Sequence, residues 1–183
     1  MPLLPRFTRD GLLPPGDHAL TIDELRESVL VLGPGEDHPN WDVAWRRRLV
    51  GNLRTLVIQL REVGVTEVSI DGSFVEDKDH PNDIDGYFVC TLQALASGDL
   101  ERELNLLDPY KAWTWDPKVR RPYPGCTKRQ LPMWHRYRVE LYPHVGQLSG
   151  ILDELGNEIE FPAAFRRSRD GRLRGIVKIS GRA

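Results

Sequence analysis

The chain has little cysteine, no long apolar run and no N-terminal leader pattern. Its 183 residues contain only Cys90 and Cys126, which are too few for a cysteine-based metal cluster and allow at most one disulfide. We expect both to be free thiols in a reducing compartment. No stretch approaches the ~20 consecutive apolar residues of a membrane-spanning helix, and residues 1–16 lack the apolar segment of a signal peptide. The sequence therefore predicts a cytoplasmic protein that does not contact a membrane.

What the chain does contain is the composition of one globular domain. Hydrophobic residues make up 40% and charged residues 28%, which is enough apolar material for one core. Residues 1–20 hold four prolines and two glycines and predict an extended N-terminal arm, followed by a single domain over 21–183. Residues 1–100 carry a net charge of -8 and residues 101–183 a net charge of +6. This division suggests separate metal-binding and anion-binding faces, or a solvated surface without a function.

Hydrophobic spacing predicts helices and strands in alternation. A capping box at Thr21 and Glu24 begins a helix over 22–31, and Asn40 caps a longer helix over 41–63. Residues 108–132 show no assignable period. The other expected elements are strands at 65–70, 83–90, 136–142 and 174–179, and helices at 91–107, with a break near 97–98, and at 147–155. Strands interleaved with helices indicate the α/β or the α+β class.

The residues with chemical potential cluster between the first two expected strands. Glycine at position 72 allows backbone amides to approach a phosphate, and the Ser73 hydroxyl can donate to the same oxygens. Asp83 and Asp85 lie two residues apart on a strand, so they point to the same face and can bind one divalent ion together. Oxygen ligands favour Mg²⁺ or Mn²⁺ over Zn²⁺. Each motif alone is common by chance, but together and in this order they indicate a site for a nucleoside triphosphate and a metal.

This order resembles the signature of the nucleotidyltransferase superfamily that includes DNA polymerase beta. That signature is Gly-Ser, a spacer of about nine to thirteen residues and Asp-hydrophobic-Asp, and Gly72-Ser73 and Asp83-Ile84-Asp85 match it with a spacer of nine. The resemblance spans residues 13–177. Four segments look more narrowly like short bacterial nucleotidyltransferase-like proteins: Leu13-Pro14-Pro15-Gly16-x-His18, Asp71-Gly72-Ser73-Phe74-Val75, Pro81-Asn82-Asp83-Ile84-Asp85 and Arg169-Asp170-Gly171…Gly175-Ile176-Val177.

The resemblance implies an α+β fold, with a nucleotidyltransferase-like mixed β-sheet flanked by helices. It also implies two divalent ions, Mg²⁺ or Mn²⁺, held by three carboxylates, and transfer of a nucleoside monophosphate from an NTP to an acceptor. Asp83 and Asp85 would be two of the ligands. Glu140, on the polar face of the strand at 136–142, is the expected third, and the alternative for it is an ion pair with a neighbouring base. Gly86 stands where an apolar residue is common in the superfamily.

Basic residues are available to neutralise a triphosphate. Lys78 is the only base within the acidic spacer, and we expect it either to contact a phosphate or to balance the local charge. Six bases alternate with three aromatic residues over 111–129. That composition suits a nucleic-acid or nucleotide surface, although the rings can equally anchor a loop to the core. The arginines over 166–174 extend the basic character as a binding face or as a solvated tail.

We therefore predict a metal-dependent nucleotidyltransferase that modifies RNA, with tRNA the first choice, or a protein hydroxyl. By analogy of fold with bacterial toxin–antitoxin and defence systems, a cognate antitoxin is a further expected partner. One alternative is a non-catalytic nucleotide-binding module that acts as an antitoxin or regulator. Another is a nucleic-acid-binding protein that uses the basic second half of the chain. The predicted site comprises Asp83, Asp85 and Glu140 as catalytic and metal-binding residues and Gly72, Ser73 and Lys78 as nucleotide-binding residues.

Overall fold

The structure, a computed structural model, describes residues 3–36, 38–125, 127–168 and 170–181. Five of its strands form one mixed sheet: β1 Asp17–Leu20, β2 Val68–Asp71, β3 Ile84–Val89, β4 Val139–His144 and β7 Ile176–Ile179. They lie in the order β1-β7-β2-β3-β4. The β1–β7 and β3–β4 pairs are parallel, whereas β7–β2 and β2–β3 are antiparallel. The remaining strands, β5 Leu148–Leu152 and β6 Glu158–Glu160, form a separate antiparallel hairpin.

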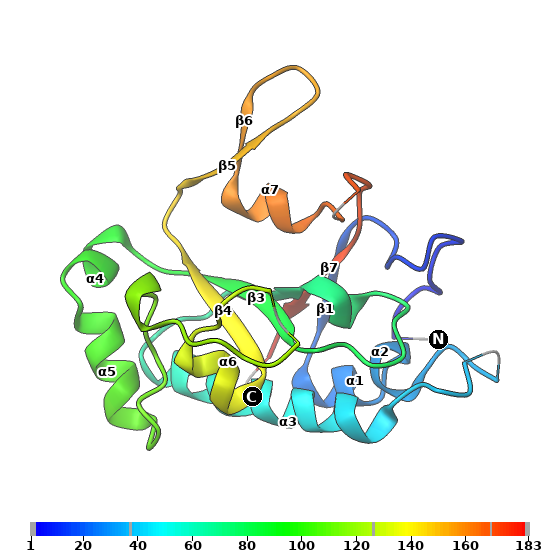
Figure 1. The fold of residues 1–183 in the computed structure, drawn as a ribbon, viewed down its shortest axis with the longest axis horizontal. Coiled ribbons are helices and arrows are strands. Elements are labelled where there is room, and N and C mark those ends of the chain that lie inside the picture. Colours follow the sequence, from blue (N-terminus) through cyan, green and yellow to red (C-terminus); the bar gives the residue numbers. More distant parts are fainter. Residues whose placement is uncertain (1–2, 37, 126, 169, 182–183) are drawn as a thin grey trace.

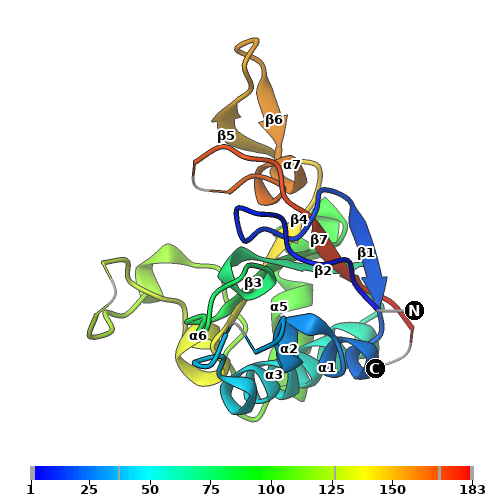
Figure 2. The same cartoon turned by 90° about the vertical axis from the view of Figure 1, so that its right-hand side faces the viewer.

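Helices cover one face of the sheet and one end of it. In Figure 1, α1, α2, α3 and α6 lie along one face, α4 and α5 lie beyond the β4 side, and α7 lies on the opposite side with the β5–β6 hairpin. Figure 2 shows the hairpin projecting away from the body of the molecule. The bounds are α1 Ile22–Arg26, α2 Val29–Leu32, α3 Val43–Glu62, α4 Leu92–Ala96, α5 Asp99–Leu107, α6 Pro132–Tyr137 and α7 Phe161–Phe165, with 3-10 helices η1 Gly72–Val75 and η2 Pro117–Val119. The predicted α+β class is confirmed.

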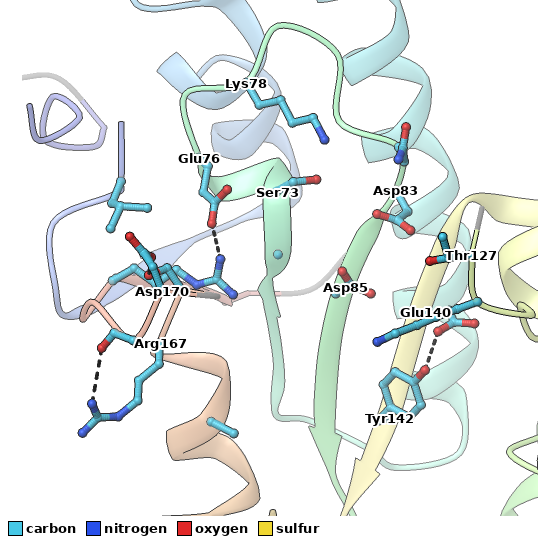
Figure 3. Close-up of a pocket in the computed structure, with 18 of the residues that line it drawn as sticks. Ser73, Glu76, Lys78, Asp83, Asp85, Thr127, Glu140, Tyr142, Arg167 and Asp170 are labelled. Atoms are coloured by element: carbon cyan, nitrogen blue, oxygen red, sulfur yellow. Dashed lines mark hydrogen bonds and ion pairs between the residues drawn. The ribbon is translucent and has the colours of Figure 1, made fainter. Parts of the chain in front are cut away.

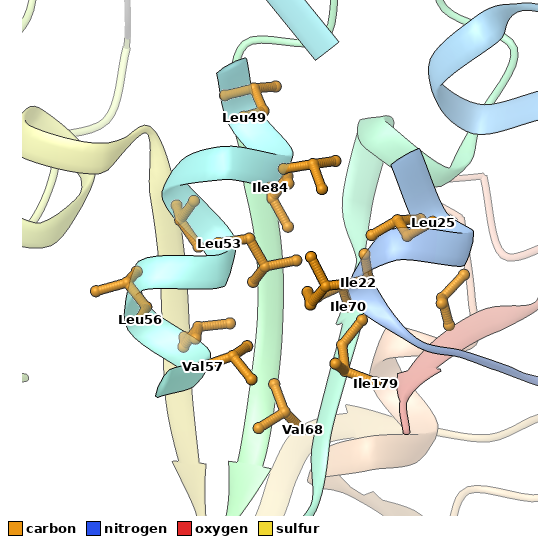
Figure 4. Close-up of a cluster of buried hydrophobic side chains, with 14 of the residues drawn as sticks. Ile22, Leu25, Leu49, Leu53, Leu56, Val57, Val68, Ile70, Ile84 and Ile179 are labelled. Atoms are coloured by element: carbon orange, nitrogen blue, oxygen red, sulfur yellow. The ribbon is translucent and has the colours of Figure 1, made fainter. Parts of the chain in front are cut away.

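The core lies between α3 and the sheet. Residues at helical spacing give α3 a continuous apolar face, and Leu53 and Val57 on it are fully buried against Ile70 of β2 and Ile84 of β3 (Figure 4). Side chains alternate along a strand, so the residues next to these inward-facing ones point to the other face of the sheet. Burial against α3 therefore determines that the polar residues of β2, β3 and β4 face away from the helix.

Packing in the middle of this sheet explains why residue 86 is a glycine. A Cβ at this position would lie 2.3 Å from the backbone oxygen of Ser69 and 3.0 Å from Cδ2 of Leu141. The close packing between β2 and β4 therefore leaves no space for a side chain at this position, which accounts for the glycine.

Several predicted element boundaries need correction. The capping box is confirmed, since Thr21 and Glu24 exchange backbone-to-side-chain hydrogen bonds of 2.7 and 3.1 Å, but the helix over 22–31 is split into α1 and α2. The long helix is capped by Asp42, whose Oδ1 accepts from Trp45 N at 2.9 Å, and not by Asn40. The break near 97–98 is confirmed, because Gly98 has φ +77° between α4 and α5.

The helix predicted over 147–155 is wrong, because that segment forms the β5–β6 hairpin. The carboxylate of Asp153 accepts hydrogen bonds from the backbone amides of Leu155 and Asn157, at 2.9 and 2.8 Å, and Gly156 has φ +82°. These are features of a tight turn, and they outweigh the apolar residues that suggested a helix. The strand predicted over 136–142 begins only at Val139, because the preceding residues belong to α6.

The N-terminal segment is packed onto the domain. Its last four residues form β1 at the edge of the sheet, and Leu13 is fully buried. No helix in the described part of the chain is both long enough and apolar enough to cross a membrane. Cys90 is a half-buried free thiol whose pKa is raised by burial, while Cys126 and Arg169 lie outside the described residues.

Candidate active site

The Gly-Ser turn lies at the end of β2, where the chain leaves the sheet as the 3-10 helix η1. Gly72 has φ +77°, a conformation that favours glycine. A Cβ on Gly72 would lie 2.6 Å from Oδ2 of Asp85. Glycine is therefore required at this position because it allows the turn to lie directly against a carboxylate of the neighbouring strand. The sequence did not show this close contact.

Three carboxylates form a row across adjacent strands. Asp85 of β3 is opposite Asp71 of β2 in the antiparallel register, and it is opposite Glu140 of β4 in the parallel register. Asp83 immediately precedes β3, and its Oδ2 accepts a hydrogen bond of 2.5 Å from the indole nitrogen of Trp134. In the view of Figure 3, Asp85 lies between the Ser73 turn and Glu140, with Asp83 beside it. Strand register thus gathers acidic residues that are far apart in the sequence.

The carboxylate of Glu140 already has protein partners. Oε1 accepts a hydrogen bond of 2.9 Å from Leu131 N and lies 3.7 Å from Nη1 of Arg120. Oε2 accepts a hydrogen bond from the hydroxyl of Tyr142, whose pKa is raised by burial and by this carboxylate. Both oxygens of Glu140 are therefore engaged, and they connect β4 to the base of the segment over 120–131.

Burial and mutual repulsion raise the pKa of three aspartates at the site. Burial, followed by repulsion from Asp83, Glu140 and Asp71, raises the pKa of Asp85 to about 8. Burial also raises the pKa of Asp71 to about 7, an effect that the Arg174 guanidinium opposes. The pKa of Asp83 is raised by burial, while the hydrogen bond from the Trp134 indole opposes that shift. Asp71, Asp83 and Asp85 therefore bind a proton more readily than ordinary aspartates do.

An open cavity of about 1430 Å³ lies above this row of carboxylates. One wall comes from described residues over 120–125 and 127–130, and another comes from described residues over 164–168 and 170–174 together with Asp10 and Leu12. The predicted site residues all line it: Gly72, Ser73, Lys78, Asp83, Asp85 and Glu140. The structure therefore brings together all six residues of the predicted site.

Comparison with known proteins gives the chain a family but no activity. The sequence model of DUF6932, described as a family of unknown function, matches residues 5–180. The chain belongs to this family. Searches among curated proteins and among solved structures returned no match.

Two arginines of this DUF6932 protein hold parts of the site in place. Sequence reasoning did not assign either of them to the site. The side chain of Arg174 is 10% exposed, and its guanidinium pairs with Oδ2 of Asp71 at 2.8 Å and with Glu76. Arg174 is therefore not part of a solvated tail, which was one of the two interpretations of the arginines over 166–174. A sequence signal did exist for Asp71, which directly precedes the Gly-Ser pair, but nothing local indicated its partner 103 positions away.

The second arginine, Arg46 of α3, holds the loop that follows the Gly-Ser turn. It is fully buried, and its guanidinium donates to four backbone carbonyls, at 2.6 Å to Leu30, 2.8 Å to Phe74, 3.3 Å to Glu76 and 2.5 Å to Lys78. Three of these carbonyls belong to the loop over 74–78. A single side chain from the helix layer therefore determines the path of one wall of the site.

Two of the three expected ligands have carboxylate oxygens available for a hard divalent cation. Asp83 and Asp85 face the cavity, and in the described part of the chain no donor forms a hydrogen bond with the Asp85 carboxylate, so two oxygens are available there. Glu140 is held by the partners described above. Within the described ranges, no group of three or more His, Cys, Asp or Glu side chains is arranged to hold an ion. Asp83 and Asp85 thus present carboxylate oxygens, which are the ligands that Mg²⁺ and Mn²⁺ prefer.

Proposed function

We propose that this protein is a Mg²⁺- or Mn²⁺-dependent nucleotidyltransferase that moves a nucleoside monophosphate from an NTP to a hydroxyl of an RNA or protein acceptor. The observation that carries the proposal is the placement of Asp83 and Asp85, which face one large cavity beside the Gly72 turn. Closely spaced, poorly solvated carboxylates repel one another, and a divalent cation offsets that repulsion. A cavity with acidic residues at its floor and basic residues in its walls suits a metal-bound triphosphate.

The chain's own residues would divide the work as follows. Asp83 and Asp85 hold the metal, and the Trp134 indole fixes the orientation of the Asp83 carboxylate. Ser73 and Lys78, in the same cavity, contact phosphate oxygens. A divalent ion bound there lowers the pKa of the acceptor hydroxyl and stabilises the charge of the departing pyrophosphate.

The reaction exchanges one phosphorus–oxygen bond for another. The acceptor oxygen forms a bond with the α-phosphorus while the bond from that phosphorus to the oxygen bridging the β-phosphate breaks. Pyrophosphate leaves, and the hydroxyl proton passes to water.

The test is transfer of label from each α-³²P NTP, with Mg²⁺ or Mn²⁺, to a total extract of RNA and protein. Asp83→Asn/Asp85→Asn removes both charges at nearly constant shape. Glu62→Gln/Glu67→Gln is the matched control, because both of its carboxylates are exposed and lie outside the cavity. We expect label with the wild type and the control and none with the site variant. Sensitivity of the labelled band to ribonuclease or to protease identifies the acceptor.

A non-catalytic nucleotide-binding module, acting as an antitoxin or regulator, is the second candidate. The engagement of both Glu140 oxygens favours it, because a site with two available carboxylates binds one ion more readily than the two that transfer requires. Metal-dependent NTP binding in a calorimeter, without label transfer by the wild type, would establish this alternative. Absence of both binding and transfer would refute both functions.

A further inference from the structure

The basic residues of the second half of the chain separate into two groups with different surroundings. The described arginines over 166–174 all have carboxylate partners: Arg166 pairs with Asp17, Arg167 with Glu154, Arg172 with Asp10 and Asp170, and Arg174 with Asp71 and Glu76. Their charge is therefore balanced within the protein.

The second group lies on the loop over 117–131, which contains five basic residues and no acidic one. Arg120 lies 3.7 Å from Glu140. In the part of the chain that the structure describes, the other four cations of this loop have no carboxylate within 4 Å; they are Lys118, Arg121, Lys128 and Arg129, and all four are exposed. An exposed group of unpaired cations attracts a polyanion.

Backbone hydrogen bonds fix the base of this loop. Arg121 and Gln130 exchange backbone hydrogen bonds of 2.8 Å in both directions, which closes the loop as a hairpin. Its far half forms part of the cavity wall through Gly125, Thr127 and Lys128. A chain bound along the loop would consequently have one end within the cavity that Asp83 and Asp85 face.

Flat side chains accompany the charge. Tyr123, near the tip of the loop, is 37% exposed, and its ring packs edge-on against Trp134 with 5.0 Å between centroids. The guanidinium of Arg138 lies 4.1 Å from the Tyr123 ring centroid and 3.9 Å from that of Trp134. Aromatic rings held in place next to cations are the usual surface for unstacked bases, since the rings contact bases while the cations contact phosphates.

We propose that the loop over 117–131 binds a single-stranded nucleic acid whose terminal hydroxyl is the acceptor of the transferred nucleotide. The assignment of an acceptor rests on the proposed function, but the binding surface does not. A protein acceptor fits less well, because an acidic peptide would use the cations without the exposed ring. Of the two acceptor classes, a nucleic acid therefore fits this surface better than a protein.

The test is fluorescence anisotropy with the full chain, without NTP or metal, so that its result is independent of transfer. The probes are a labelled 12-nucleotide RNA, a DNA of the same sequence and a 12-residue polyglutamate, each titrated between 50 and 200 mM KCl. The variant Lys118→Ala/Arg121→Ala/Lys128→Ala removes three cations of the loop. Arg26→Ala/Arg47→Ala/Arg48→Ala removes three exposed cations from α1 and α3 and is the matched control.

We expect the wild type to bind an oligonucleotide more tightly than polyglutamate, and the stronger of RNA and DNA identifies the natural strand. The loop variant should reduce the slope of log Kd against log salt by about 2, since each phosphate contact on a single strand contributes ~0.7. Tyr123→Ala should weaken binding about tenfold, while Tyr123→Phe, which keeps the ring, stays within twofold. Far-UV circular dichroism verifies that the variants are folded.

Equal losses in the two triple variants, or tighter binding of polyglutamate than of either oligonucleotide, would overturn the inference. The two proposals fail separately. Oligonucleotide binding without any transfer contradicts only the proposed function. Label transfer to protein by a chain that binds no oligonucleotide contradicts the nucleic-acid surface and its acceptor assignment, but not nucleotidyl transfer.

Discussion

Replacement of Arg46 by alanine should destabilise the protein by about 3–5 kcal/mol. The carbonyls of Leu30 and Phe74, which accept from Arg46, are buried, and a buried carbonyl without a donor costs about 1–3 kcal/mol. Those two groups alone account for about 2–6 kcal/mol. The guanidinium also lies 3.9 Å from the Trp41 ring centroid, a contact worth about 0.5–2 kcal/mol.

One effect opposes this loss. Burial lowers the pKa of Arg46, which reflects the free energy of removing its charge from water, and deletion of the side chain recovers part of that free energy. The unpaired carbonyls remain buried in the variant, however, so the loss prevails. Arg46→Lys retains three donors on a single nitrogen and should lose about half as much.

The measurement is equilibrium unfolding in urea followed by tryptophan fluorescence, with an unchanged m-value as the sign that the two-state analysis holds. Arg47→Ala, one residue further along α3 and exposed, is the control and should change the free energy of unfolding by less than about 0.5 kcal/mol. Hydrogen exchange should also accelerate over residues 74–78. A loss below about 1 kcal/mol for Arg46→Ala would refute the assignment of this side chain as the support of the loop.

Three further predictions address the site and the sheet edge. Gly72→Ala combines a strained φ with a collision at Asp85, so it should lower both the urea midpoint of unfolding and the Mn²⁺ affinity measured by calorimetry. Gly64→Ala is the control, because Gly64 has φ +85° but no heavy atom within 4 Å of an added Cβ. It should lower only the midpoint. Trp134→Phe removes a donor to a proposed ligand and should weaken Mn²⁺ binding at least tenfold in the same assay; an unchanged affinity contradicts the two-carboxylate site. Two neighbouring cations hold the pKa of Asp17 near 2, below its ordinary 3.8, so its stabilisation is fully present above pH 3.8 and is lost as the pH falls toward 2. The gap in melting temperature between wild type and Asp17→Asn, small because the pair is partly exposed, should close over that pH range, and a gap that widens there contradicts the ion pairs.

Much of the fold could be predicted because its signals are local. The capping box, the apolar face of α3 and the alternation in β2 and β3 each depend on residues within a few positions of one another. The Gly-Ser and Asp-x-Asp pairs were found for the same reason, and strand alternation alone places Asp83 and Asp85 on one face. The hairpin over 148–160 was missed because its turn chemistry, centred on Asp153, competes with an apolar pattern that also suits a helix.

The amino-acid sequence by itself therefore determined most residues of the candidate site and the secondary-structure elements that hold them. Only the tertiary structure decided how they meet. Register between β2, β3 and β4 aligns Asp71, Asp85 and Glu140, and chain closure brings Arg174 to Asp71. Such pairings join residues up to about a hundred positions apart, so no local pattern encodes them. Packing of the sheet against α3 selects them, because that packing buries one face of each strand and leaves the other to the site.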